Sequence, residues 1–224
     1  MTRVEVVYRA RAYDTPTDPF AADTPAPGFR YDDDLGLAVS AAGVITQRGP
    51  FSEVAAAHAD AAVIDLRSGI LLPGLVDTHV HFTQVRVIGA LGMPLLEWLD
   101  RCALPEEVHL ASPEYAATIA GEFVASLISA GTTTSLVFGS HFAPAVDALF
   151  AEASRFGLRI SSGLVVSDRI LPELLLTTPE RAYEEAVGLA ARWHGQGRAR
   201  YAVTPRFSLS ASDPILAACA AVMG

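Results

Sequence analysis

The chain has 224 residues, of which 51% are hydrophobic, and its mean hydropathy is +0.33. This composition is typical of a globular protein with enough apolar side chains for a large core. Acidic residues number 25 and basic residues 16, so the net charge is −9. The negative charge argues against nucleic acid or an anionic membrane as a partner. No run of 18 apolar residues occurs, so we expect no membrane span.

The cysteine content and the first residues bear on the cellular compartment. Two cysteines, Cys102 and Cys219, are too few for a disulfide framework and suit a reducing environment. The segment Met1–Glu5 does not begin the long apolar stretch of a secretory signal. We therefore expect a cytoplasmic protein.

Residues 1–70 contain short β-strand patterns and predict a small N-terminal β domain. Four prolines between residues 13 and 31 predict a loop. The acidic run Asp32-Asp33-Asp34 is interpreted as a solvated turn, and a turn at Ala42-Gly43 predicts a hairpin. The strand patterns of this region lie at residues 4–8, 37–39, 44–45 and 62–66.

Residues 71–224 alternate between strand and helix patterns, which predicts an α/β fold with a parallel sheet or barrel. Ser112 and Thr178 are helix N-cap candidates, and Gly131 and Gly157 are helix stop signals. Between residues 82 and 110 we expect an irregular stretch with one or two helical turns near Leu95–Leu99. The four strands are expected near residues 75–81, 132–138, 158–166 and 201–204.

Four strands make only half of a closed (β/α)8 barrel, which takes eight strands and about 250 residues. Residues 71–224 therefore correspond to the first four β/α units of an incomplete barrel. Half a barrel leaves two open sheet edges and an uncovered interior. We expect that the chain either pairs with another chain or is a piece of a longer protein.

The strongest functional signal is the segment Leu72–Gln84, where Pro73-Gly74 precedes a strand ending in His79-x-His81. Residues i and i+2 of a strand point to the same face, about 6.5–7 Å apart. Two imidazoles at this spacing can converge on one cation such as zinc. An isolated His-x-His is more often a pair of solvated histidines, but its place at the end of an apolar strand favours a metal site.

The motif and its surroundings carry a family resemblance. Pro73–His81 resembles the first barrel strand of the amidohydrolase superfamily, which implies a (β/α) barrel with one or two metals at its mouth. The order and spacing of further segments resemble the guanine deaminases across residues 71–213. In one departure, Leu104-Pro105 stands where that family usually has Phe-Pro. The segments that carry this closer resemblance are His79–Gln84, Pro94–Leu99, Pro105–Glu107 and Thr204–Ser210.

The resemblance implies that His79 and His81 hold zinc and that a water activated by zinc attacks C2 of guanine, giving xanthine and ammonia in purine catabolism. In the family, two more histidines, an acid–base glutamate and an aspartate come from strands five, six and eight. We therefore expect no catalytic acid or base within this chain. His141 follows the second strand and is interpreted as a loop histidine near the mouth. The remaining histidines lack ligand spacing: His58, His109 and His194.

Four residues are candidates for binding the substrate: Gln84, Trp98, Arg206 and Phe207. Guanine presents two adjacent acceptors, O6 and N7, and the fork of an arginine such as Arg206 can pair with both. Gln84 offers both donors and an acceptor, and the two aromatic side chains can stack on a purine or wall its pocket. Each candidate also has an ordinary structural interpretation. Arg206 could be a surface arginine in a salt bridge and Gln84 a polar loop residue. The two aromatic residues could belong to the core.

Two other functional hypotheses stay open. The chain could belong to a different amidohydrolase that acts on a related purine or a triazine ring, or it could be a truncated, inactive chain that at most binds metal weakly or serves as an assembly partner. For the full-length form of the leading hypothesis, we expect a homodimer.

Overall fold

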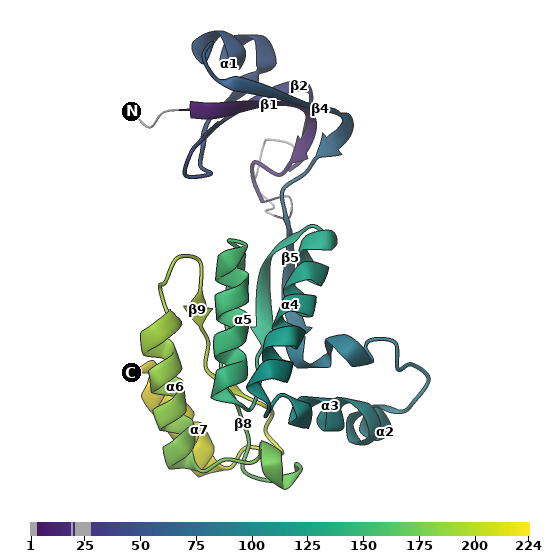
Figure 1. The fold of residues 1–224 in the computed structure, drawn as a ribbon, viewed down its shortest axis with the longest axis vertical. Coiled ribbons are helices and arrows are strands. Elements are labelled where there is room, and N and C mark those ends of the chain that lie inside the picture. The colour runs from purple at the N-terminus through teal and green to yellow at the C-terminus, as the bar shows by residue number, and fades with distance from the viewer. Residues whose placement is uncertain (1–3, 19, 21–27) are drawn as a thin grey trace. The chain divides into compact units, whose positions relative to one another are not determined.

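A computed structural model describes residues 4–18, 20 and 28–224 and divides the chain into two compact units, Met1–Pro73 and Gly74–Gly224 (Figure 1). Each unit has its own hydrophobic core. The predicted loop between residues 13 and 31 lies partly outside the described residues, since 19 and 21–27 are not included.

The first unit is a four-stranded sheet in the order β3-β2-β1-β4, which confirms the predicted small β domain. Strand β1 pairs antiparallel with β2 and parallel with β4, and the predicted hairpin joins β2 to β3. The helix α1 packs Val54 against Val7 and Ala38 of the sheet. The elements are β1 (Val4–Asp14), β2 (Arg30–Ser40), β3 (Ile45–Pro50), α1 (Phe51–Ala57) and β4 (Ala62–Leu71).

The interpretation of Asp32-Asp33-Asp34 as a solvated turn is wrong, because all three lie within strand β2. Asp34 accepts hydrogen bonds from Arg9 of β1 at 2.6 and 2.7 Å, and Asp32 accepts one from Arg48 of β3. Aspartate is depleted in strands. Here arginines on both neighbouring strands neutralise the carboxylates as cross-strand pairs.

The second unit contains parallel strands in the order β5-β6-β7-β9, with a short parallel pair of β8 and β10 beyond them. This confirms the α/β fold and the half-barrel arrangement. The predicted third and fourth strands are each split in two, at Gly163-Leu164 and Ala202-Val203. The strands are β5 (Leu75–His81), β6 (Thr132–Phe138), β7 (Arg159–Ser162), β8 (Val165–Val166), β9 (Arg200–Tyr201) and β10 (Thr204–Pro205).

Helices follow the strands and begin and end at the predicted signals. Ser112 Oγ accepts a hydrogen bond from Tyr115 N at 3.2 Å, and Thr178 Oγ1 accepts one from Arg181 N at 3.3 Å. Gly131 has a φ of 77°, which suits a glycine just past a helix end. The helices are α4 (Pro113–Ser129), α5 (Ala143–Arg155), α6 (Pro179–Trp193) and α7 (Asp213–Met223).

The stretch after β5 is more helical than predicted. A 3₁₀ helix spans Phe82–Val87. Then α2 (Leu95–Trp98), a π-helical turn (Leu99–Ala103) and α3 (Leu104–His109) follow one another directly. Pro105 does not interrupt this run of helical turns, because it lies in the first turn of α3, where its missing N–H is tolerated. The segment from α2 to α3 carries two residues of the candidate site, Trp98 and Glu107.

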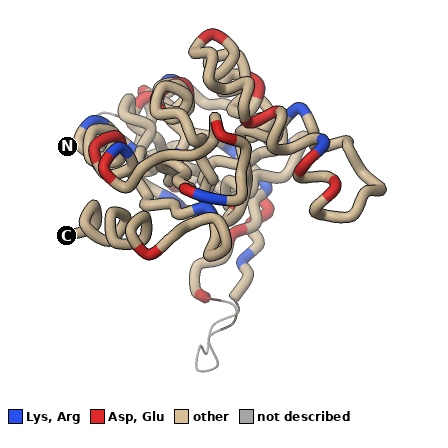
Figure 2. The backbone as a smooth tube through the Cα atoms, turned by 90° about the horizontal axis from the view of Figure 1, so that it is seen from below, with Lys and Arg blue, Asp and Glu red and all other residues tan. Residues whose placement is uncertain are grey.

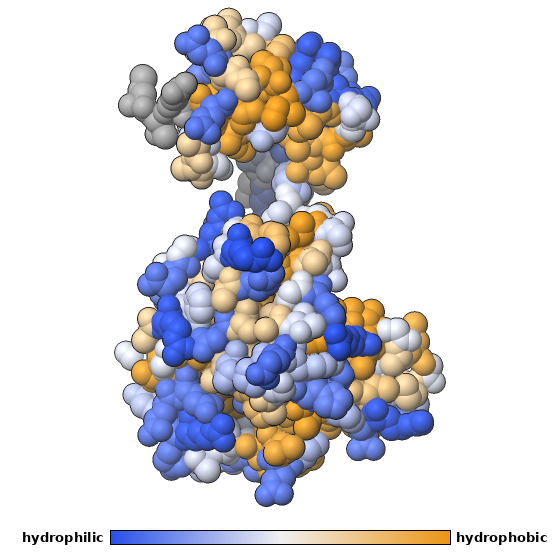
Figure 3. Space-filling view, viewed as in Figure 1, coloured by the Kyte–Doolittle hydropathy of each residue, from blue (hydrophilic) through white to orange (hydrophobic). Residues whose placement is uncertain are grey.

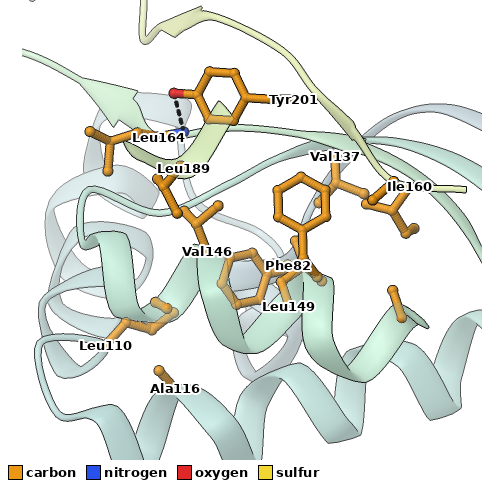
Figure 4. Close-up of a cluster of buried hydrophobic side chains, with 14 of the residues drawn as sticks. Phe82, Leu110, Ala116, Val137, Val146, Leu149, Ile160, Leu164, Leu189 and Tyr201 are labelled. Atoms are coloured by element: carbon orange, nitrogen blue, oxygen red, sulfur yellow. Dashed lines mark hydrogen bonds between the residues drawn. The ribbon is translucent and has the colours of Figure 1, made fainter. Parts of the chain in front are cut away.

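The core of the second unit lies between the sheet and its helices (Figure 4). Phe82, Val146 and Leu149 are fully buried in this cluster. Tyr201 OH accepts a hydrogen bond from Leu164 N at 3.3 Å across the break in the third strand. Since Phe82 directly follows His81, its burial anchors the end of β5 that carries both histidines.

Several apolar strand residues of the second unit remain exposed. Leu75 and Val76 of β5 are 56% and 63% exposed, and Leu136 of β6 is 46% exposed. Apolar side chains reach the surface of both units (Figure 3). Parallel sheets are normally covered on both faces, so exposed apolar strand residues fit a partial sheet that further strands would complete.

Acidic and basic residues are interspersed along the backbone (Figure 2). Several form surface ion pairs, including Arg86 with Glu122, Arg155 with Glu152 and Arg181 with Glu185. In the described part of the chain, we find no helix that combines the length and the apolar character needed to cross a bilayer.

Candidate functional site

Two histidine rings lie next to each other at the end of β5. The ring centroids of His79 and His81 are 5.3 Å apart, and their planes are inclined at 64°. Phe138, the last residue of β6, pairs in register with His81 and stacks on its ring with a centroid distance of 4.6 Å. The backbone N–H of His79 donates to Asp77 Oδ1 at 3.0 Å. Pairing of β5 with β6 therefore holds both imidazoles at one end of the sheet.

The histidine pair fits part of a zinc site. Imidazole nitrogens are ordinary zinc ligands, and burial lowers the pKa of His81, which favours the neutral form that binds metals. Among residues 4–18, 20 and 28–224, no group of three or more His, Cys, Asp or Glu is placed to hold a metal ion. A catalytic zinc takes three protein ligands and a water, so His79 and His81 need at least one further ligand.

A pocket of about 250 Å³ opens beside the histidines. His79, His81, Gln84 and Trp98 all line it, so the structure brings four of the six predicted site residues together. Gln84 lies in the 3₁₀ helix after β5, and Trp98 is the last residue of α2. Trp98 is half-buried and faces this pocket, so it is not an ordinary core aromatic. An aromatic wall with a few polar groups suits a small, flat ligand.

A buried ion pair connects Arg206 to this region. Arg206 directly follows β10, and its side chain is 10% exposed. Its Nη1 donates to Glu107 Oε2, and its Nη2 donates to Glu107 Oε1 at 3.1 Å. Glu107 lies in α3, is 3% exposed, and its Oε1 also accepts a hydrogen bond from Gln84 Nε2 at 2.9 Å. Through Glu107, Arg206 and Gln84 become neighbours although they lie far apart in the sequence.

His141 completes this group, which we call the Glu107 cluster: Gln84, Glu107, His141 and Arg206. His141 lies between β6 and α5, as expected for a loop histidine, but its side chain is only 4% exposed. Its Nε2 is 3.0 Å from Arg206 Nη1. An arginine has only N–H donors, so this Nε2 must accept and the imidazole is neutral. Burial accordingly lowers the pKa of His141 to about 4.

Comparisons with known proteins place the chain in a family. Residues 70–223 match the model of the amidohydrolase family. The chain belongs to the amidohydrolase family. This amidohydrolase chain is 59% identical over 221 residues to a probable guanine deaminase of Deinococcus radiodurans, a match that covers 97% of the chain and 50% of that protein. It is 43% identical over 155 residues to the guanine deaminase of Escherichia coli strain K12, covering 69% of the chain and 35% of that protein.

A solved structure agrees with these sequence matches. The crystal structure of guanine deaminase from Bradyrhizobium japonicum is similar with a TM-score of 0.89 and 38% identity, over 96% of the amidohydrolase chain and 46% of that protein. The matches to the Deinococcus radiodurans and Bradyrhizobium japonicum proteins cover nearly all of the chain, but the chain spans only about half the length of these proteins. The matched half includes the histidine pair, the pocket and the Glu107 cluster.

Two predicted site residues of the amidohydrolase chain, Arg206 and Phe207, do not line the pocket beside the histidines. Arg206 is connected to it through Glu107 and Gln84. Phe207, by contrast, is 41% exposed and lies outside the Glu107 cluster. Its carbonyl oxygen accepts a hydrogen bond from Ser210 N at 3.1 Å, which shapes the turn after Arg206. A role for Phe207 against the substrate therefore stays a prediction.

Glu107 was not predicted as a site residue, although the sequence contains a signal for it. Ala103, Glu107 and Leu110 recur at the i, i+4 and i+7 spacing of one helix face. All three are buried, at 0%, 3% and 1% exposure. A carboxylate on the apolar stripe of a helix needs a buried partner, so this position in the amidohydrolase chain predicts an ion pair, although the spacing does not reveal its partner.

Proposed function

We propose that this chain forms the N-terminal half of a zinc-dependent guanine deaminase. In that reaction, guanine and water give xanthine and ammonia: the bond from C2 to the amino nitrogen breaks, and an oxygen from water takes its place. Relatives at 59% and 43% identity bear the name of this activity. The observation that carries the proposal is a nearly buried Arg206 that is joined through Glu107 to Gln84, which lines the same pocket as both histidines.

The chemistry of these side chains suits a purine. The guanidinium of Arg206 can donate to two adjacent acceptors, and O6 and N7 of guanine form such a pair. Gln84 adds an amide at the pocket wall. Trp98 supplies an aromatic surface for the flat base, and we assign Phe207 to the same purpose. The task of these residues is to bind and orient the base.

We assign His79 and His81 to zinc. When bound, zinc supplies the Lewis acidity that makes water reactive at neutral pH. The two imidazoles are part of the ligand set, and the other ligands and the acid–base residue belong to the half of the protein outside this chain. Phe138 keeps both rings in place from the neighbouring strand.

The cellular setting stays a prediction. Cys102 and Cys219 are both free, which supports a reducing compartment such as the cytoplasm. The full-length form is expected to be a homodimer, and a role in purine catabolism follows from the proposed reaction.

The proposal is tested by ammonia release from guanine, adenine and 8-oxoguanine, measured with the full-length protein. We expect the highest kcat/KM for guanine and a stoichiometric content of zinc. His79→Ala and His81→Ala should lose zinc and activity, while His109→Ala, at an exposed histidine, should lose neither. A preference for another purine or a triazine ring would establish the alternative amidohydrolase function, and a full-length protein without zinc or turnover would contradict both.

A further inference from the structure

We propose that Glu107 is a positioning residue that determines which edges of Arg206 and Gln84 face the substrate. Glu107 binds the Nη1–Nη2 end of the guanidinium and the amide nitrogen of Gln84. The Nε–Nη2 side of Arg206 and the amide oxygen of Gln84 are then presented to the base. This inference rests on the proposed function, because it concerns how the same site recognises a 6-oxopurine.

The hydrogen bonds of Arg206 show which donors are committed. A guanidinium has five N–H donors. Nη1 uses both of its hydrogens, one on Glu107 Oε2 and one on His141 Nε2, and Nη2 uses one on Glu107 Oε1. Within the described residues, Nε–H and the second hydrogen of Nη2 have no acceptor. These two donors point the same way from one edge of the plane, which is the geometry that pairs with two adjacent acceptors.

The orientation of Gln84 follows from the same carboxylate. An ionised carboxylate only accepts hydrogen bonds, so the group of Gln84 at 2.9 Å from Glu107 Oε1 must be its NH2 group. The amide oxygen of Gln84 consequently remains as an acceptor. Glu107 therefore excludes the flipped amide, which would place two acceptors against each other.

Together, the uncommitted groups form a pattern of two parallel donors and one acceptor. A 6-oxopurine such as guanine presents O6 and N7 as adjacent acceptors, with N1–H as a donor next to O6. Adenine replaces O6 with an amino donor, and its N1 carries no hydrogen. The Nε–Nη2 side of Arg206 would then place an N–H donor against the donor of that amino group, which is repulsive. The cluster therefore discriminates against 6-aminopurines.

Burial keeps this arrangement in place before the substrate binds. The side chains of Glu107, His141 and Arg206 are 3%, 4% and 10% exposed. Rotating the guanidinium would leave a buried carboxylate and a buried imidazole nitrogen without their donors, which is costly. The cluster thus presents its donors without reorganisation when the base arrives.

The test compares the binding of hypoxanthine and 7-deazahypoxanthine to the full-length protein by calorimetry. Both bases lack the 2-amino group, so neither can be deaminated, and they differ only in the N7 acceptor. For the unsubstituted protein we expect hypoxanthine to bind about 10- to 100-fold more tightly. In Glu107→Gln the guanidinium loses its charged partner, and this ratio should fall towards one.

The matched control is Glu106→Gln, which makes the same chemical change one residue earlier in α3. Glu106 accepts a hydrogen bond from Tyr115 OH at 2.5 Å and lies outside the Glu107 cluster. This variant should keep the full preference for hypoxanthine. If Glu107 has only a structural role, Glu107→Gln should weaken the binding of both bases equally. The ratio of the two affinities would then be unchanged, and this result would overturn the inference.

The outcomes separate this inference from the proposed function. Base binding is measured without turnover, so a protein that does not deaminate guanine but shows the expected ratios would contradict the proposed function alone. Active protein with an unchanged ratio in Glu107→Gln would contradict the positioning role alone. If Glu107→Gln does not fold, a crystal structure of the unsubstituted protein with hypoxanthine decides: Nε and Nη2 of Arg206 should lie on O6 and N7, and contact through Nη1 would overturn the inference.

Discussion

Glu107 and Arg206 form a bidentate ion pair between α3 and the segment after β10, with side chains only 3% and 10% exposed. The pair of Arg155 and Glu152 on α5 is the surface counterpart in the same chain, with exposures of 64% and 23%. A surface pair contributes little to stability, whereas removing one partner of a buried pair leaves an uncompensated charge. This contrast leads to predictions for stability and for binding.

Glu107→Leu should lower the free energy of unfolding by about 3–5 kcal/mol, because it leaves the guanidinium of Arg206 buried without a counter-charge. The double variant Glu107→Leu/Arg206→Met should recover most of that loss, since two apolar side chains replace the pair. Urea unfolding of the single and double variants measures both values. Glu152→Leu, at the surface pair, should change little, and equal losses at both sites would contradict the prediction.

Arg206→Lys should raise the KM for guanine by about 10- to 100-fold, because an ammonium cannot donate to two adjacent acceptors as a planar fork does. The charge opposite Glu107 is kept, so the loss in stability should be smaller than for Glu107→Leu. Steady-state kinetics of ammonia release measure the effect. Arg155→Lys provides the control on the surface, and an unchanged KM in Arg206→Lys would remove Arg206 from the binding site.

His141 predicts a loss of stability at mildly acidic pH. Its pKa is about 4 in the folded protein, and it is about 6.5 in an unfolded chain. Between these values the unfolded state binds the extra proton, so stability falls as the pH drops from 6.5 towards 4, by at most about 1.4 kcal/mol per pH unit. The charged groups that face the imidazole are Glu107 and Arg206. The comparison variant His141→Gln removes the imidazole and keeps both of these groups.

The free energy of unfolding of both proteins should be measured by denaturant titration between pH 7 and pH 4. The difference between the unsubstituted protein and His141→Gln isolates the imidazole, because all other titrating groups are common to both. A difference that is constant across this range would show that His141 is not buried in its neutral form.

Gly139→Ala should destabilise the second unit by about 1–3 kcal/mol, a typical cost of overpacking. A Cβ at Gly139 would lie 1.9 Å from the carbonyl oxygen of Gly163, so the two strand ends would have to separate. Gly188→Ala in α6 is the matched control, because a Cβ at Gly188 would have no atom within 4 Å apart from its chain neighbours and the backbone of its own helix. Helix propensity predicts that this control gains about 0.5–1 kcal/mol. Thermal unfolding of both variants should show shifts of opposite sign.

Much of the fold could be predicted from local patterns. The caps at Ser112 and Thr178 and the glycine stop at Gly131 were recognisable, because capping depends on a few consecutive residues. Asp32-Asp33-Asp34 was misinterpreted, because its place in β2 depends on arginines from neighbouring strands. The helical segment containing α2 and α3 was underestimated, since charged residues interrupt its apolar spacing, and one of them, Glu107, belongs to the site.

The sequence by itself determined the alternation of strands and helices, the histidine pair at the end of the first barrel strand and the candidacy of Gln84, Trp98 and Arg206. The alternation and the histidine pair depend on residue spacing, which the backbone periods of strand and helix convert directly into faces. The candidacy of the other three residues came from the resemblance to a known family and from the chemistry of their side chains. Only the tertiary structure decided that Glu107 and His141 hold Arg206. Contacts between residues so distant in the chain depend on how the elements pack, and no local pattern specifies which buried charge meets which.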